Sequence, residues 1–202
     1  MSEPYLFLSK LVRYVKLNWW RLTVPVKMKA SGVRLNGKVQ FFGMPIVSMV
    51  QGSEIEVDAD AVLCSVSEMT ALGVSRPVIL RTLRPQARIK IGRDCGLSGT
   101  TVCAAQSISI GKECLIGADV LICDTDFHAL PPEGRRFNDL AQAIRTAPIT
   151  IEDNVFIGAR SIVLKGVSIG CNSVIGAGSM VVADIPANVL AAGNPAKVIR
   201  AL

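Results

Sequence analysis

The residues best suited to chemistry lie together in the segment Asp-Thr-Asp-Phe-His, residues 124–128. His128 is the only histidine of the chain, and Asp124 and Asp126 come shortly before it. A neutral imidazole can remove a proton near neutral pH, and a carboxylate on its second nitrogen can orient the ring. An isolated histidine is more often a surface residue without function than a catalytic residue. The position of His128 in the chain is needed to decide between these two interpretations.

A six-residue repeat surrounds this segment. An aliphatic side chain recurs at Ile151, Ile157, Val163, Ile169, Ile175 and Val181. Two positions before each stands a small or β-branched residue, which would share its strand face. This period predicts a β-solenoid in which three flat sides form a coil of about 18 residues. Gly, Asn and Asp tolerate positive φ, so left-handed corners are expected at five of the positions three residues later. These are Asn154, Gly166, Asn172, Gly178 and Asp184, with Arg160 as the exception.

The repeat also runs from Ile91 to Ile122, with a slip of one residue after Cys103, and it then stops until Ile151. A solenoid cannot enclose such an insertion, so residues 124–147 are predicted to project as an excursion loop. Sites are often built on loops that a rigid scaffold positions. The position of His128 at the start of this loop therefore favours a functional histidine.

The pattern divides the chain into a helical or extended segment (1–32), a β-helix (33–186) and a C-terminal segment (187–202). Residues 33–63 are predicted to form irregular early coils of the β-helix. Residues 67–77 are predicted to form a loop. Residues 2–22 predict a short amphipathic helix that ends at Trp19 and Trp20. Its apolar face could associate weakly with an anionic membrane surface through residues 1–22, or pack on the solenoid or a neighbouring subunit. Its small number of basic residues favours packing.

Composition limits the function. The formal net charge of +6 favours anionic partners, such as the phosphates of a cofactor or an acidic glycan. No basic run is interleaved with stacking aromatics, so no nucleic-acid partner is expected.

Six cysteines without a Cys-x-x-Cys pair, together with one histidine, predict buried reduced thiols and no metal. Neither a signal segment nor an apolar span is visible, which predicts a cytoplasmic location.

Five motifs carry a resemblance that covers residues 89–202. They are Gly-Leu-Ser-Gly-Thr (96–100), the histidine segment (124–128), Val-Phe-Ile-Gly-Ala (155–159), Ser-Val-Ile-Gly-Ala-Gly-Ser (173–179) and Ala-Gly-Asn-Pro-Ala-Lys-Val-Ile-Arg (192–200). With them the chain resembles the left-handed β-helix hexapeptide-repeat acyltransferases, in particular the bacterial sugar and polysaccharide O-acetyltransferases. The resemblance implies a left-handed helix, acetyl-CoA as co-substrate, and active sites between the subunits of a homotrimer.

The resemblance also implies roles for single residues. His128 would be the general base, Asp124 or Asp126 would orient it, and Ser98 could hold the acceptor hydroxyl. The positions that match the coenzyme A groove are Phe156, Gly158, Ala159, Gly176, Ala177, Lys197 and Arg200. Many relatives have Thr-Lys where this chain has Val182 and Ala183, which leaves Lys165 or Arg160 as a compensating cation.

These roles predict direct acetyl transfer to a sugar hydroxyl of a bacterial surface glycan or its precursor. A covalent acyl-cysteine route is disfavoured, because Cys123 follows the repeat and should point inward or into a corner. Two alternatives stay open: an N-acetyltransferase of a nucleotide-linked amino sugar, and a non-catalytic β-helix scaffold. A zinc-dependent hydratase on this fold would need three histidines and is excluded.

Overall fold

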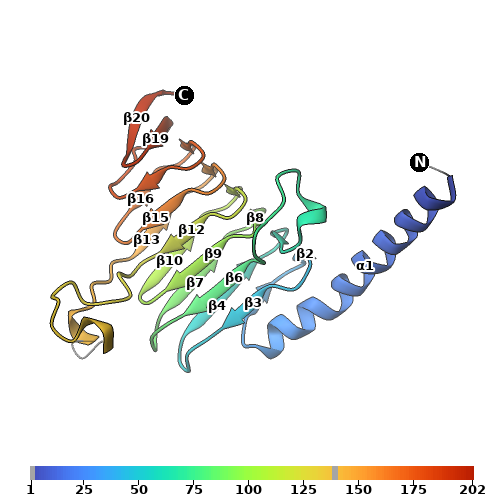
Figure 1. Ribbon diagram of the computed structural model, residues 1–202, viewed down its shortest axis with the longest axis horizontal. Helices are drawn as coiled ribbons and strands as arrows, with labels where there is room; N and C mark the ends of the chain where they lie inside the picture. The colour runs from blue at the N-terminus through green and yellow to red at the C-terminus, as the bar shows by residue number, and fades with distance from the viewer. Residues whose placement is uncertain (1–2, 138–140) are drawn as a thin grey trace.

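The computed structural model describes residues 3–137 and 141–202. Figure 1 shows a three-sided β-helix from which one long helix extends at the N-terminal end and one loop projects on the opposite side. Residues 1–2 of the predicted N-terminal segment and 138–140 of the predicted excursion lie outside the described residues.

Three sheets with parallel strands form the sides of the β-helix. Sheet A contains β1 (Arg34–Asn36), β4 (Glu54–Asp58), β7 (Arg88–Ile91), β10 (Ser107–Ile110), β13 (Ile149–Ile151) and β16 (Ser168–Ile169). Sheet B contains β2 (Gln40–Phe42), β5 (Val62–Cys64), β8 (Gly96–Ser98), β11 (Leu115–Ile116), β14 (Phe156–Ile157), β17 (Val174–Ile175), β19 (Val189–Gly193) and the antiparallel β20 (Ala196–Ala201). Sheet C contains β3 (Ile46–Ser48), β6 (Ile79–Thr82), β9 (Thr101–Ala104), β12 (Leu121–Cys123), β15 (Ile162–Leu164) and β18 (Met180–Val181).

The core is a column of stacked side chains from the positions that the repeat predicts to face inward. Ile151 pairs with Ile169 and Ile157 with Ile175, as a coil of about 18 residues requires. All six predicted aliphatic positions are buried, and so are the six positions two residues before them. The buried serines among these satisfy their hydroxyls by donating to corner carbonyls. For example, Ser161 Oγ donates to Gly176 O at 3.0 Å.

The left-handed corners differ from the prediction at two positions. Asn154, Gly166, Asn172 and Gly178 have positive φ as expected, but Asp184 does not. Arg160, the predicted exception, has a φ of 59°. Stacking of the coils therefore imposes the left-handed corner on an arginine, while the Asp184 carboxylate accepts from Ser168 N at 2.7 Å instead.

Glycine allows close approach of neighbouring coils at the corners. A Cβ at Gly170 would lie 2.4 Å from the backbone nitrogen of Ala187, which cannot move without shifting its own coil. We expect Gly170→Ala to lower the free energy of unfolding by about 1–3 kcal/mol, measured by denaturant titration. Gly96→Ala is the control, because its Cβ would meet only the flexible end of Leu115 at 3.4 Å. Equal stability of the two variants would contradict this account of the corners.

The N-terminal helix α1 spans Glu3–Ala30, so the prediction that it ends at Trp19 and Trp20 is wrong. It continues through Pro25, although proline lacks the N–H for an intrahelical hydrogen bond. Val24 and Met28 explain the extension. They lie one turn apart and are both buried in the core cluster at the first coil. Tertiary packing thus outweighs the helix-breaking signal.

The early coils are more regular than predicted. Strands β1 to β5 pair in register with the next coil; Arg34, for example, lies opposite Glu56, and Glu56 opposite Lys90. The period is obscured because an excursion that includes the 3-10 helix η1 (Ser67–Met69) lengthens one coil. A second excursion separates β12 from β13 and carries η2 (Arg135–Phe137) and η3 (Ala141–Ala143).

Candidate active site

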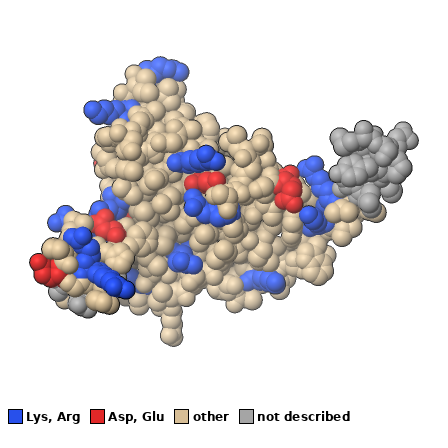
Figure 2. Space-filling view, viewed as in Figure 1, with Lys and Arg blue, Asp and Glu red and all other residues tan. Residues whose placement is uncertain are grey.

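We call the excursion of residues 124–147, which carries His128, the histidine loop. It leaves the β-helix where β12 of sheet C ends, and it returns to β13 of sheet A. A short antiparallel contact closes its base. Thr125 bridges Thr146, Asp126 N donates to Arg145 O at 3.1 Å, and Ala147 N donates to Asp124 O at 3.1 Å. Figure 2 shows basic side chains over this loop, where Arg135, Arg136 and Arg145 are exposed.

His128 is exposed and held by a tight turn. Its N–H donates to Asp126 O at 2.7 Å across Phe127, which has a φ of 62°. The imidazole Nδ1 lies 3.3 Å from Arg135 O. A carbonyl oxygen can only accept, so a hydrogen bond between these two atoms requires a proton on Nδ1. A neutral imidazole protonated at Nδ1 is a form that can act as a general base.

The side chain of Asp124 is held by backbone amides of the β-helix. Its side chain is fully buried and accepts from Ala105 N at 2.6 Å and from Gln106 N at 2.7 Å. Burial raises the pKa of Asp124, and the two amide hydrogen bonds oppose that effect. Both carboxylate oxygens are thus used to hold the corner between β9 and β10, so the contacts assign Asp124 a structural role.

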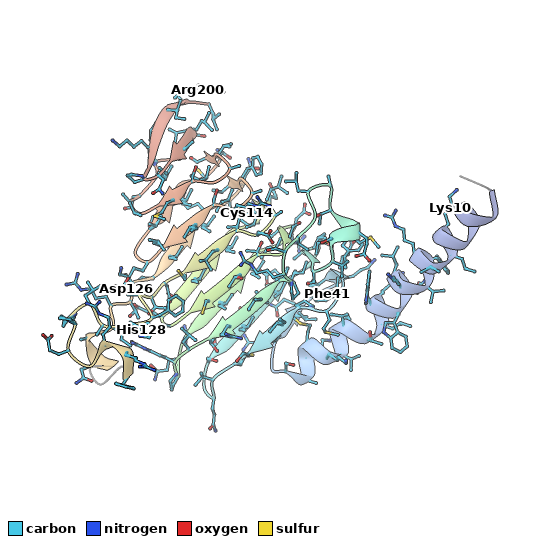
Figure 3. The ribbon with its side chains drawn as sticks, in the orientation of Figure 1. Lys10, Phe41, Cys114, Asp126, His128 and Arg200 are labelled. Atoms are coloured by element: carbon cyan, nitrogen blue, oxygen red, sulfur yellow. The ribbon has the colours of Figure 1, made fainter. Side chains whose placement is uncertain are left out.

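Asp126 lies in the loop beside His128 (Figure 3) and forms a partly buried ion pair. Its Oδ1 is 2.6 Å from Lys165 Nζ, and the two side chains are 22% and 28% exposed. Among the described residues, Oδ2 of Asp126 is buried without a hydrogen-bond partner. The pair ties the loop to sheet C. The pair also occupies Lys165, a residue expected from the resemblance as a compensating cation for the cofactor.

A second group of predicted residues lies at another corner of the β-helix. We define the BC corner as the turns from sheet B to sheet C at residues 99–100, 117–120, 158–161 and 176–179. Ser98 precedes the first of these turns, and the triplet Ile-Gly-Ala enters the other three at 116–118, 157–159 and 175–177. Successive coils place these turns about 5 Å apart, in a line.

The backbone amides of the BC corner fall into two classes. Gly158 N donates to Ile175 O at 2.7 Å and Gly176 N to Ala191 O at 2.8 Å, so both link coils. Among the described residues, no acceptor is found for the amides of Ala118, Ala159 and Ala177. The alanines, not the glycines, can therefore donate to a ligand. Ala118 was missed, although its Ile-Gly-Ala triplet signals it.

The remaining predicted cofactor residues lie on sheet B beside this corner. Phe156 is 45% exposed and belongs to an outward apolar row with Leu115 and Val174. The same row continues through β19 to Arg200 on β20. Lys197 and Arg200 are exposed on this hairpin, at the C-terminal end of the molecule (Figure 3).

The loop and the BC corner lie at opposite ends of sheet C within one chain. The strands β9 and β12 run between them, and three or four residues cover about 10–13 Å. A site that contains both His128 and Ser98 would thus need the loop of one copy beside the corner of another. Within one chain, His128 lies beside Asp126, and Ser98, Ala159 and Ala177 lie on different coils along the same BC corner.

Other chemistry is less well supported. Cys123 is buried, and burial raises the pKa of its thiol to about 11. The thiol is therefore protonated at neutral pH and poorly suited to carry an acyl group. Among the described residues, no cluster of three or more His, Cys, Asp or Glu side chains could hold a metal ion.

A family model described as "Hexapeptide repeat of succinyl-transferase" matches residues 107–123 and 148–183. A solved galactoside acetyltransferase in complex with coenzyme A is 26% identical, covers 100% of this chain and 84% of its own, and superposes with a TM-score of 0.51. In its repeat and its fold the chain therefore resembles the hexapeptide-repeat acyltransferases. Its fold is the left-handed parallel β-helix: the repeat predicted the three-sided coils, and the resemblance predicted their hand.

Curated relatives match in part. Galactoside O-acetyltransferase of Escherichia coli is 41% identical over 115 residues, which cover 56% of this chain and 54% of that protein. A 2,3,4,5-tetrahydropyridine-2,6-dicarboxylate N-acetyltransferase of Clostridium perfringens is 54% identical over 55 residues, 27% of this chain and 23% of that protein. The chain spans about half, or less, of the length of these relatives.

Proposed function

We propose that the chain is an acetyl-CoA-dependent O-acetyltransferase that modifies a sugar hydroxyl of a bacterial surface glycan or its precursor. The observation that carries this proposal is the placement of His128, the only histidine of the chain, at the start of the projecting loop with its Nδ1 3.3 Å from Arg135 O. The galactoside O-acetyltransferase relative and the solved coenzyme A complex support the substrate classes. The net charge of +6 suits the phosphates of coenzyme A.

In this mechanism the acetyl group passes directly from sulfur to oxygen. Nε2 of His128 removes the acceptor hydroxyl proton while the oxygen attacks the thioester carbonyl. The new C–O bond forms, the C–S bond breaks, and the proton on Nε2 passes to the departing thiolate. An amide of the BC corner, at Ala159 or Ala177, would stabilise the transient oxyanion. The remaining corner amides would bind the pantetheine arm.

The same proposal implies an assembly. His128 and the BC corner lie too far apart in one chain, so we propose a homotrimer with a site at each interface. The exposed apolar side chains of sheets B and C support it, for example Leu115, Phe156 and Ile46. Sheet A, in contrast, presents polar residues such as Lys90 and Thr150 outward, as a solvent-facing side would.

We further propose a cytoplasmic protein whose helix α1 contacts the inner face of the membrane. Exposed apolar residues form a stripe on the side of α1 away from the core: Val12, Val15, Trp19, Leu22 and Val26. Six basic residues and no acidic residue occupy positions 10–30, which suits an anionic lipid surface. No helix among the described residues is long and apolar enough to span a membrane.

The activity is tested by thiol release from acetyl-CoA against simple sugars, nucleotide sugars, oligosaccharides and polysaccharides. We expect release with a hydroxyl acceptor. The N-acetyltransferase relative motivates the alternative, an amino sugar linked to a nucleotide, which amine acceptors in the same panel would reveal. Absence of release with every acceptor would favour the non-catalytic scaffold.

The cofactor site is tested at Lys197 and Arg200. Because both are exposed cations on the hairpin beside the BC corner, replacing both with alanine should raise the Michaelis constant for acetyl-CoA about fivefold or more at low salt. Added salt should reduce the difference, since it screens exposed charges. Lys112→Ala on a distant turn is the control. An unchanged affinity for coenzyme A at low salt would show that the phosphates bind elsewhere.

A further inference from the structure

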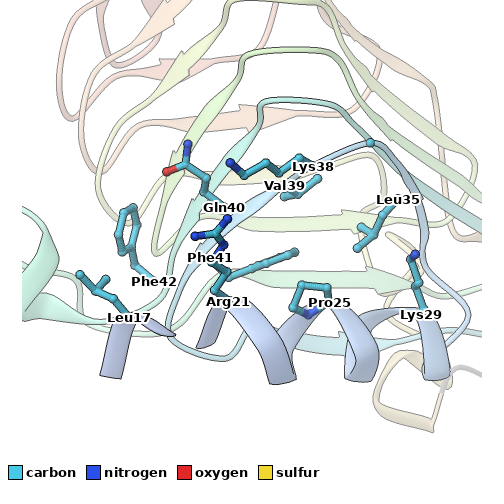
Figure 4. Close-up of a pocket in the computed structure, with 11 residues that line it drawn as sticks. Leu17, Arg21, Pro25, Lys29, Leu35, Lys38, Val39, Gln40, Phe41 and Phe42 are labelled. Atoms are coloured by element: carbon cyan, nitrogen blue, oxygen red, sulfur yellow. The ribbon is translucent and has the colours of Figure 1, made fainter. Parts of the chain in front are cut away.

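A pocket of about 580 Å³ lies between α1 and the first coil of the β-helix (Figure 4). One wall is a stripe of α1 with a spacing of four residues: Leu17, Arg21, Pro25 and Lys29. The other wall is the chain from Leu35 to Phe42, which includes Lys38 and Phe41. Its size is in the range of small-molecule sites, and neither the histidine loop nor the hairpin of β19 and β20 contributes to it.

The polar groups of this pocket are almost all cationic. Arg21, Lys29 and Lys38 contribute three positive charges, and none of the described residues that line it is acidic. Within the described chain, these three cations form no ion pair, whereas Lys16 on the same helix pairs with Glu68 at 3.5 Å. The uncompensated charge selects an anionic ligand.

Besides the neutral amide of Gln40, the other side chains that line the pocket are apolar. They are Leu17, Pro25, Leu35, Val39, Phe41 and Phe42. On α1, the pocket residues Arg21 and Pro25 each precede a residue of the exposed apolar stripe, Leu22 and Val26. The basic pocket therefore adjoins the surface that we assign to the membrane, and an apolar chain could pass from one to the other.

The pocket is also in register with the proposed acceptor site. Phe42 pairs with Cys64, and Cys64 with Ser98, along one row of sheet B. Two strand spacings separate Phe42 from Ser98, about 10 Å. The end of the pocket at Phe42 therefore lies close to the start of the BC corner.

From this geometry we infer that the pocket binds a lipid phosphate: a phosphate or diphosphate ester whose apolar chain lies against α1. Arg21 and Lys38 bind the phosphate oxygens, Lys29 adds positive charge two turns further along α1, and Leu17, Pro25 and Phe42 cover the first carbons of the chain. Its role rests on the proposed function: the bound phosphate would hold a lipid-linked sugar with its hydroxyl toward Ser98. Binding itself does not depend on that function.

A nucleotide fits the pocket less well. A base binds by stacking on an exposed aromatic face, but Phe41 is only 4% exposed and Phe42 is half-buried. A free phosphate would not use the apolar lining. These two ligands therefore serve as comparison arms in the test.

The test is calorimetric titration of the full chain with decyl phosphate, kept below its micelle concentration. We expect decyl phosphate to bind at least about tenfold more tightly than inorganic phosphate, decanol or uridine diphosphate. Only decyl phosphate has both an anionic group for the cations of the pocket and an alkyl chain for its apolar lining. The double variant Arg21→Gln/Lys29→Gln should weaken it about tenfold. The matched variant Arg13→Gln/Lys27→Gln, with the same charge change on α1 outside the pocket, should bind like the wild type.

Three results would overturn the inference: equal binding of decyl phosphate and inorganic phosphate, tighter binding of uridine diphosphate, or equal effects of the two double variants. Light scattering shows whether each variant keeps the wild-type assembly. Thiol release with a soluble sugar, measured in parallel, separates this inference from the proposed function. Decyl phosphate binding without transferase activity would uphold the pocket, and activity without such binding would refute it.

Discussion

Replacing His128 with alanine is expected to lower turnover by about 10²–10⁴-fold, because it removes the general base. The fold should be retained, since His128 is an exposed loop residue outside the buried column of the repeat. Binding of acetyl-CoA should also survive, because the proposed cofactor groups lie at the BC corner and on the C-terminal hairpin. Single-turnover kinetics with saturating acceptor measures the chemical step, and titration with coenzyme A measures binding.

Glu133→Ala is the matched control, as it changes another exposed residue of the same loop. It should leave turnover close to that of the wild type. The histidine assignment would be wrong if His128→Ala kept its assembly and still transferred acetyl at a near wild-type rate. Since the chain has no other histidine, a histidine-selective reagent should also inactivate the wild type with one modification per subunit.

Two inactive variants are expected to restore activity when they assemble together. His128→Ala lacks the base, and Ala177→Glu places a carboxylate at the exposed BC corner, where it would repel and block coenzyme A. If each site uses the loop of one copy and the corner of its neighbour, equal mixing yields about a quarter of the sites intact. Refolding or co-expression of the two variants, followed by thiol release, should therefore recover about that fraction of wild-type activity.

The same experiment separates a shared site from a site within one chain. In the latter case every subunit would carry a defect, and the mixture would stay as inactive as its components. Mixing each variant with itself is the control for the refolding step. Light scattering that shows an active monomer near 21.5 kDa would independently contradict the proposed trimer.

The interior of the β-helix could be read from the sequence because its rule is local. Each coil repeats the same geometry, so the aliphatic residue at every sixth position and the small residue two before it must face inward. Ile157, Ser161 and Val163 follow this rule and are buried. The single histidine and the break in the repeat also located the loop, since an insertion cannot enter a closed column of side chains.

Where neighbouring coils interact, the sequence was a weaker guide. Arg160 adopts the left-handed corner because the coils above and below it require one there, although arginine has no intrinsic preference for it. The length of α1 was misjudged for a related reason. Val24 and Met28 stabilise the last turns by packing on a coil, and no pattern within the helix reveals that.

The contacts of the site were decided by tertiary structure alone. Asp124 and Asp126 are equivalent candidates in the sequence, yet one caps the corner at Ala105 and the other pairs with Lys165, 39 positions later. The carbonyl that faces the His128 ring carries no side-chain signature, because every residue has one. The sequence thus determines which residues are inside and where the loop begins. Long-range packing determines what each polar group of the loop contacts, since those partners come from distant coils.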